Sequence, residues 1–196
     1  MTTPTPLRDF IRDMTLLVSA ENTTEQNIIE QGRHLLARLV QRDDWLPDAW
    51  AQPDPQYYQQ YLLYCDPLER FSVVSFVWGP GQATPVHDHT VWGIIGVLHG
   101  AELCEPYQRD NNGKLVSTGS HRLAAGEVEA VSPTIGDIHR VRNAFDDQVS
   151  ISIHVYGADI GAVQRHVYVA DSGEVKNFIS GYSNRTLPNL WGTASH

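Results

Sequence analysis

Two histidines at alternating positions are the residues best suited to metal chemistry. His87 and His89 stand in the stretch GPGQATPVHDHTVWG, and side chains two apart on a strand project to the same face, so both imidazoles can reach one ion. A third histidine, His139, follows on another predicted strand, in DIHRVRN. Neutral imidazole suits iron, zinc, copper or nickel, and three protein ligands leave coordination positions open. We therefore expect a catalytic metal site with three histidine ligands.

A second polar group lies on one face of a later predicted strand. Ser152, His154 and Tyr156 alternate with apolar residues in QVSISIHVYG. The Ser152 hydroxyl can hydrogen-bond one nitrogen of His154, and the other nitrogen can hydrogen-bond the Tyr156 oxygen, which would fix the tautomer of the ring. The alternative is an ordinary strand whose polar face lies in solvent.

Two amphipathic helices are predicted within residues 1–46. Apolar residues recur there at helical spacing, and Thr23 with Gln26 has the pattern of a capping box before the second helix. The apolar stripes are Phe10, Ile11, Met14, Leu17 and Val18, and then Ile28, Leu35, Leu36 and Leu39. Such helices need an apolar partner, and we expect them to pack against a β-sheet.

Residues 47–170 have the texture of an all-β barrel or sandwich. Short β-rich runs, including 71–78, 91–100, 126–132 and 148–157, are separated by turn sequences such as WGPGQ and RDNNGK. No helical periodicity lies between the runs, which argues against a parallel βαβ fold. We expect a single domain over 1–196, in which residues 171–196 form an extended segment that wraps the surface.

Composition excludes several classes of protein. The chain has 196 residues, 41% of them hydrophobic, and 14 Lys+Arg against 23 Asp+Glu give a formal charge of −9. These values exclude wholesale disorder and argue against nucleic-acid or anionic-membrane partners. No apolar run approaches the roughly 18 residues of a membrane span. We expect a cytoplasmic protein without a secretory signal, in which Cys65 and Cys104 are reduced thiols rather than a disulfide.

The glycines around the histidines carry a resemblance to a known family. Two stretches resemble the two cupin motifs, the second with one extra residue on each side of its proline: Gly81-x5-His87-x-His89-x3-Gly93-x6-Gly100, and Gly126-x6-Pro133-x2-Gly136-x2-His139-x3-Asn143. Gly93 occupies the position where most cupins carry a glutamate ligand. The resemblance therefore implies a mainly β cupin barrel with a three-histidine site and the N-terminal helices packed against it.

The segments HDHT, IGDIHRVRN and SIHVYG are together similar to the thiol dioxygenases of the cysteine dioxygenase type, over about residues 71–156. This resemblance implies one non-haem Fe(II), O2 as co-substrate, and oxidation of a small thiol to its sulfinic acid. It also implies that Ser152, His154 and Tyr156 form a relay beside the iron, with the phenol placed to hydrogen-bond the substrate.

Two departures from the sequence pattern of the animal enzymes bear on which thiol is the substrate. Residues 91–94 contain no cysteine to cross-link Tyr156, and residues 59–64 contain no arginine for a substrate carboxylate. By family analogy Arg165 takes that role, an arrangement that resembles the bacterial 3-mercaptopropionate dioxygenases. The alternative for Arg165 is a surface ion pair. Arg140, expected to point outward, and Arg142, which could share the inner face but is expected to lie at the strand end, are other sources of positive charge.

Other functions remain open at this stage. The enzyme could oxidise cysteine or several thiols, or belong to another class of metal cupin, such as an isomerase or a diketone dioxygenase. A non-catalytic metal-binding sensor is the alternative outside enzymes. We further expect Asp88 and His166 to face away from the metal, and Trp78 and Trp92 to lie in the core or the pocket wall. The oligomeric state is not predicted.

Overall fold

The computed structural model describes residues 5–169 and 173–191, and most of them lie in or between β-strands. The helices are α1 (Thr5–Ser19), α2 (Glu25–Leu39) and the short 3-10 helix η1 (Asp48–Trp50). The strands are β1 (Gln59–Cys65), β2 (Ser72–Trp78), β3 (Val86–His87), β4 (Gly93–His99), β5 (Ala101–Arg109), β6 (Leu115–Ser117), β7 (His121–Ala124), β8 (Val128–Val131), β9 (His139–Asn143), β10 (Ser150–Tyr156), β11 (Arg165–Tyr168) and β12 (Val175–Phe178).

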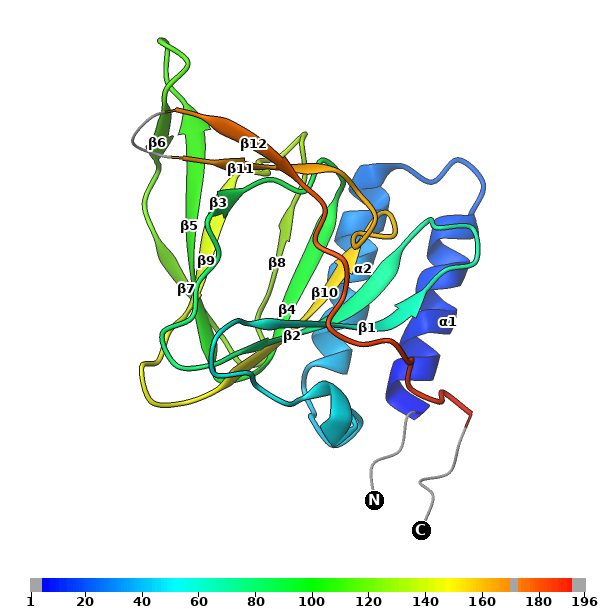
Figure 1. Ribbon diagram of the computed structural model, residues 1–196. Coiled ribbons are helices and arrows are strands. Elements are labelled where there is room, and N and C mark those ends of the chain that lie inside the picture. Colours follow the sequence, from blue (N-terminus) through cyan, green and yellow to red (C-terminus); the bar gives the residue numbers. More distant parts are fainter. Residues whose placement is uncertain (1–4, 170–172, 192–196) are drawn as a thin grey trace.

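Two antiparallel sheets face each other (Figure 1). One has the order β1-β2-β10-β4-β8, and the other has the order β12-β11-β3-β9-β5-β6 with β7 also paired to β5. Successive strands from β2 to β5 alternate between the sheets, which is the winding of a double-stranded β-helix. The predicted mainly β cupin barrel is confirmed.

Both helices cover the outer face of the first sheet (Figure 1). Their buried residues form one core cluster with side chains of β2, β4 and β10. Gly96 of β4 allows the approach of α2, because a Cβ there would lie 3.0 Å from side-chain atoms of Leu36 and Val40. The predicted cap is wrong by one residue: α2 begins at Glu25, so it is extended Thr24, not Thr23, whose side chain accepts the Asn27 N–H at 3.2 Å.

The middle strands of the first sheet, β2, β10 and β4, are buried on both faces, and this decides which side chains enter the barrel. In β10, Ile153 and Val155 pack toward the helices, whereas Tyr156 packs with Val74 and Trp78 inside the barrel. Strand alternation therefore places Ser152 and His154 inside as well. The fold thus turns the polar face of β10 toward the interior.

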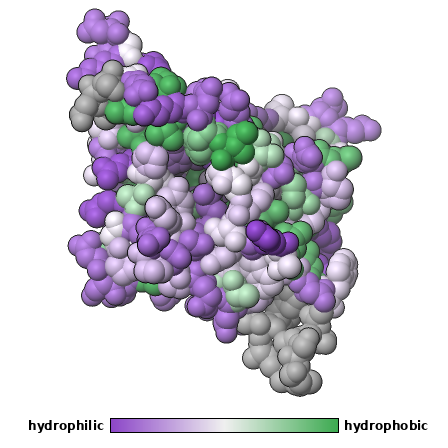
Figure 2. Space-filling view, viewed as in Figure 1, coloured by the Kyte–Doolittle hydropathy of each residue, from purple (hydrophilic) through white to green (hydrophobic). Residues whose placement is uncertain are grey.

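The chain after β11 continues along the barrel. β12 pairs with β11 beyond residue 170, and the backbone of β1 hydrogen-bonds the side chains of Ser183 and Asn184. Parts of three expected segments lie outside the described residues. These parts are residues 1–4 of the helical region, residue 170 at the end of the barrel, and residues 171–172 and 192–196 of the C-terminal segment. Hydrophobic residues form small separate patches on the face shown in Figure 2. Among the described helices, none has the length and apolar character to cross a bilayer.

Candidate metal centre and substrate cavity

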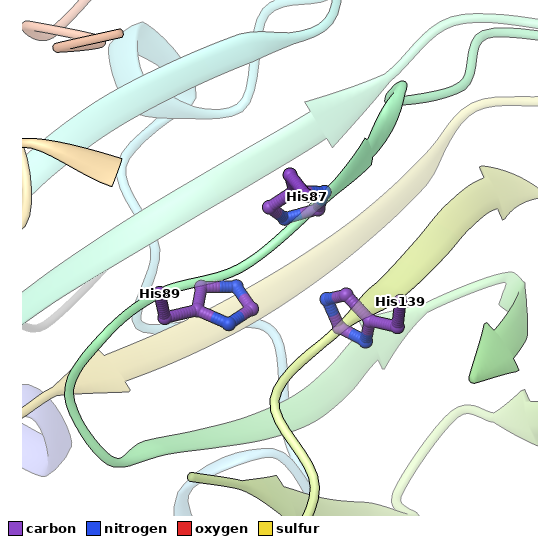
Figure 3. A group of neighbouring side chains, drawn as sticks. All are labelled: His87, His89 and His139. Atoms are coloured by element: carbon purple, nitrogen blue, oxygen red, sulfur yellow. The ribbon is translucent and has the colours of Figure 1, made fainter. Parts of the chain in front are cut away.

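Three histidine rings face one another inside the barrel (Figure 3). His87 ends β3, and His89 lies just beyond that strand rather than within it as expected. His139 begins β9, where it pairs with His87 across the two strands. The ring centroids are 4.9 Å apart for His87–His89 and His87–His139, and 5.0 Å apart for His89–His139. One nitrogen of each ring lies within 4.8 Å of the others, so the three can bind one ion.

A hydrogen-bond partner outside the triad orients each ring. The Nδ1 partners are Pro85 O for His87 at 3.0 Å, Asp137 Oδ1 for His89 at 2.9 Å, and Cys104 Sγ for His139 at 3.4 Å. With each Nδ1 engaged outward, the Nε2 atoms are the ones left to bind metal. Such outer partners fix the tautomer of metal-binding histidines.

Burial keeps the three rings in the form that binds metal. It lowers the pKa of His87 to about 4 and the pKa of His89 and His139 well below 6.5, so all three are neutral at pH 7. The His89–Asp137 contact is therefore a hydrogen bond from a neutral ring rather than an ion pair. Three neutral imidazoles with outer partners fit a divalent transition metal, ferrous iron included.

The relay predicted on β10 has the expected hydrogen bonds. Ser152 Oγ lies 2.8 Å from His154 Nε2, and His154 Nδ1 lies 2.8 Å from the Tyr156 hydroxyl. All three are buried, so the alternative of a solvent-facing strand is wrong. Burial lowers the pKa of His154 well below 6.5 and raises that of Tyr156, so both are neutral. The Tyr156 ring stacks on His89 with centroids 5.2 Å apart, which joins the relay to the metal site.

The triad, His154 and Tyr156 line one cavity of about 190 Å³. Arg165 lines it too, and the other lining residues are mostly apolar or aromatic: Tyr58, Gln60, Phe76, Trp78, Thr84, Pro85, Val141, Val167 and Phe178. No aspartate or glutamate is among these described lining residues. This volume lies below the roughly 300 Å³ of ordinary drug-sized sites, so the cavity suits a ligand of few atoms.

Arg165 is a buried cation at the start of β11. It is 3% exposed, its guanidinium carbon lies 4.5 Å from the centroid of the Phe178 ring, and one amino group donates to Ser180 Oγ at 2.6 Å. Its Nε atom has no hydrogen-bond partner, and no carboxylate of the described residues forms an ion pair with it. The alternative of a surface ion pair is therefore wrong. A buried charge without a counter-ion is costly, so the site favours an anionic ligand.

The other arginines near the triad do not reach the cavity. Arg140 and Arg142 are both exposed, on the opposite face of β9 from His139 and Val141. The alternative that Arg142 shares the inner face is wrong, because side chains two apart on a strand point the same way and Arg140 points outward. Arg142 is the last residue but one of β9, near the strand end as expected.

The outward-facing residues beside the ligands have structural partners. Asp88 faces away from the triad, as predicted, and accepts hydrogen bonds from the His166 backbone N–H and the Tyr168 hydroxyl, both at 2.8 Å. His166 Nδ1 also contacts this carboxylate at 2.8 Å, so His166 points away from the cavity, as predicted. Trp78 lines the cavity and Trp92 is buried in the core under the helices, as predicted.

Sequence reasoning missed the residues that hydrogen-bond the triad rings from outside. Asp137 accepts from the backbone N–H groups of His89 and Thr90 as well as from the His89 ring. Its place two residues before His139 was the available signal. The two cysteines are unpaired, as predicted. Cys104 instead contacts His139 and, with His121 and Glu129, forms a second group of possible metal ligands among the described residues.

Comparisons with known proteins agree with this arrangement. The family model for cysteine dioxygenase type I matches residues 21–168. Cysteine dioxygenase type 1 from Rattus norvegicus is 24% identical over 156 residues, and that from Homo sapiens is 24% identical over 160; each match covers 78% of this chain and 74% of the relative.

Solved structures with a similar chain course include a cupin protein from Desulfovibrio desulfuricans, with a TM-score of 0.39 and 23% identity over 54% of this chain and 87% of that one. Another is an uncharacterised protein with a double-stranded β-helix domain from Klebsiella pneumoniae, with a TM-score of 0.44 and 17% identity over 68% of this chain and 87% of that one. The family assignment rests instead on the family model, which spans well over half of the 196 residues. The chain belongs to the cysteine dioxygenase type I family, whose members are thiol dioxygenases.

Proposed function

We propose that this chain is an Fe(II)-dependent dioxygenase that oxidises 3-mercaptopropionate with O2 to the sulfinic acid. One observation carries the proposal: a single small cavity joins a triad of neutral histidines to a buried arginine that forms no ion pair with a carboxylate of the described residues. The substrate 3-mercaptopropionate is a short molecule with a thiol at one end and a carboxylate at the other. The thiol matches a metal held by the triad, and the carboxylate matches Arg165.

His87, His89 and His139 are the residues that would hold the iron. Ferrous iron held there would supply open coordination positions for a thiolate sulfur and for O2. Because all three rings are neutral, the protein ligands add no negative charge to the ion, which favours arrival of the thiolate. The reaction is balanced by one thiol and one O2, since both oxygen atoms end on sulfur.

Arg165 is the proposed carboxylate-binding residue. A guanidinium can bind a carboxylate through two parallel hydrogen bonds, which fixes the distance from carboxylate to sulfur and so selects the length of the substrate. Cysteine carries an additional ammonium group, and none of the described residues that line the cavity is acidic and able to accept it. The cavity therefore favours 3-mercaptopropionate over cysteine.

Tyr156 is the proposed donor toward the bound substrate. Its hydroxyl is held by His154, and its ring lies across the strand pair from Gly93. A Cβ at residue 93 would lie 3.0 Å from two atoms of that ring, so only glycine at this position leaves enough space for the ring. With no cysteine at residues 91–94, the phenol stays free of a cross-link.

The test is anaerobic loading with Fe(II), followed by O2 uptake and sulfinate analysis with a panel of thiols. We expect turnover of 3-mercaptopropionate to exceed that of cysteine, and cysteamine, which lacks a carboxylate, to react poorly. H139A should lose iron and turnover together, whereas H34A, at an exposed position of α2, should keep both. Full turnover by H139A, or no thiol-dependent O2 uptake by the loaded protein, contradicts the proposal.

The same panel separates the other functions. Equal rates with cysteine and 3-mercaptopropionate indicate a broad thiol dioxygenase, and thiol binding without O2 uptake indicates a sensor. The proposed partners are the small thiol and O2. A cytoplasmic location is part of the proposal and agrees with two unpaired thiols at Cys65 and Cys104.

A further inference from the structure

Glu102 is a carboxyl group enclosed in the barrel. It lies on β5, is 2% exposed, and its Oε1 atom has no hydrogen-bond partner among the described residues. The charged group that acts on it is Glu129 of β8, which has the same sign. A carboxylate without a cation in such surroundings is costly, so this group holds a proton more readily than an ordinary glutamate.

The side chains beside Glu102 belong to the relay. Its carboxyl group faces the Ser152 hydroxyl and the Trp78 indole, and Trp78 Nε1 donates to Ser152 Oγ at 3.1 Å. Ser152 leads to His154, and His154 leads to Tyr156, through hydrogen bonds of 2.8 Å. His154 and Tyr156 line the cavity, whereas Glu102 does not. The carboxyl group therefore stands at the end of the relay away from the substrate.

The ionisation of Glu102 decides the direction of every hydrogen bond in the line. When Glu102 is ionised, it accepts the Ser152 hydroxyl, and Ser152 in turn accepts Nε2–H of His154. Nδ1 of His154 then accepts the Tyr156 hydroxyl, so the lone pairs of the phenol face the cavity. When Glu102 is protonated, each bond runs the other way and the Tyr156 hydroxyl points into the cavity. His154 is neutral in both states and changes only its tautomer.

We propose that Glu102 stores the proton that the thiol loses on binding, an inference that rests on the proposed function. The thiol proton passes to the Tyr156 oxygen, and the Tyr156 hydroxyl proton passes to Nδ1 of His154. The Nε2 proton of His154 then moves to Ser152, and the Ser152 hydroxyl proton moves to Glu102. One S–H bond is broken and one carboxyl O–H bond is formed, with no electron transferred and no change in total charge. The phenol is left as a donor toward the sulfur.

The acidity of Glu102 suits this role. Burial raises its pKa to about 7, and Glu129 acts in the same direction, whereas Ser152 and Trp78 act to lower it. A proton acceptor works best when its pKa lies near the operating pH. The stored proton can therefore be taken up and released again at neutral pH.

Three titratable groups near Glu102, those of Cys104, Tyr156 and His154, do not change charge near neutral pH. Burial raises the pKa of Cys104 on β5 and of Tyr156 on β10, and lowers that of His154. The residue opposite Glu102 on β9 is the uncharged Asn143. Glu129 is partly exposed and contacts His121 at 2.6 Å, away from the relay.

The test counts the protons released when the thiol binds. Anaerobic calorimetric titration of the iron-loaded protein with 3-mercaptopropionate, in two buffers of different ionisation enthalpy, gives this number without turnover. At pH 8 Glu102 is ionised before the thiol binds, and the negative charge of the bound thiolate then raises its pKa so that it keeps the transferred proton. The wild type should therefore release close to none, and E102Q should release about one per chain. At pH 6, where Glu102 already holds a proton, both should release about one.

Two further variants locate the proton store. E105Q makes the same charge change on the opposite face of β5 and should behave as the wild type does. Y156F interrupts the relay while Glu102 is retained, and should release about one proton at pH 8, with iron content measured for every variant. Release of about one proton by the wild type at pH 8, or of none by E102Q, overturns the inference, and the first result needs no variant to fold. If the wild type binds no thiol or consumes no O2, it is the proposed function that fails.

Discussion

Asp137 Oδ1 lies 2.9 Å from Nδ1 of His89, although Asp137 stands two residues before a different histidine of the triad, His139. The same carboxylate accepts the backbone N–H groups of His89 and Thr90. One short segment therefore orients two of the three histidines, the first through its carboxylate and the second through the strand that follows it. The positions of His89 and His139 are coupled as a result.

Replacement of Asp137 should weaken metal binding without removing a ligand. Asn in D137N presents an amide N–H to backbone donors that need an acceptor, and loss of such outer partners typically lowers metal affinity by about 10–100-fold. Competition with a chelator for Fe(II) measures the change. D147N, at an exposed position, is the matched control and should bind iron as the wild type does. Unchanged affinity in D137N would show that the orientation of His89 does not depend on this carboxylate.

Replacement of Arg165 should discriminate between thiols with and without a carboxylate. Removal of one partner of a buried charged pair costs about 2–5 kcal/mol, so kcat/KM for 3-mercaptopropionate should fall by about a hundredfold in R165M. R165K keeps the charge but loses the bidentate hydrogen-bonding geometry of the guanidinium. Its kcat/KM should therefore lie between those of the wild type and R165M. The thiol 2-mercaptoethanol has no carboxylate, so its kcat/KM should agree within a few fold among the wild type, R165M and R165K. An equal loss for both thiols in R165M would indicate a general structural role.

Two glycines of β4 offer a matched pair of crowding mutations. A Cβ at Gly93 would lie 3.0 Å from the Tyr156 ring, and a Cβ at Gly96 would lie 3.0 Å from Leu36 and Val40 under α2. Each alanine variant should lose about 1 kcal/mol of unfolding free energy, because crowding a packed core is destabilising. Only G93A should lower kcat, since it displaces the phenol. Comparison of urea unfolding and kcat checks this, and a similar fall of kcat in G96A would count against it.

Glu102 should give stability a pH dependence of definite sign. Its pKa is about 7 in the folded chain against 4.5 as the ordinary value, so the folded state binds more protons between these two pH values. The free energy of unfolding should therefore fall as pH rises from about 4.5 to 7, by about 3 kcal/mol in total, and this contribution should be flat above that range. Urea unfolding of the wild type and E102Q at pH 5 and pH 8 isolates the effect, because E102Q lacks the ionisation. Parallel pH curves for the two proteins would mean that Glu102 has an ordinary pKa in the fold.

Much of the fold could be predicted because the deciding patterns are local. Strand alternation predicted that Ser152, His154 and Tyr156 share a face, and helical spacing predicted that α1 and α2 are amphipathic. Errors arose where a local rule was misapplied. Arg142 shares the direction of Arg140, and the cap of α2 lies at Thr24 because the chain turns one residue later than the Thr23 pattern indicates.

The sequence by itself determined the candidate ligands His87, His89 and His139 and the direction of the β10 side chains, because residue type and the alternation of a strand are local properties. Only the tertiary structure decided that Arg165 lies in the same cavity without a carboxylate partner in the part of the chain that the structure describes, and that Glu102 meets the far end of the relay. Both depend on which distant strands enclose the barrel interior. Burial there, and not residue type, shifts the pKa of Glu102 and leaves the charge of Arg165 without a counter-ion.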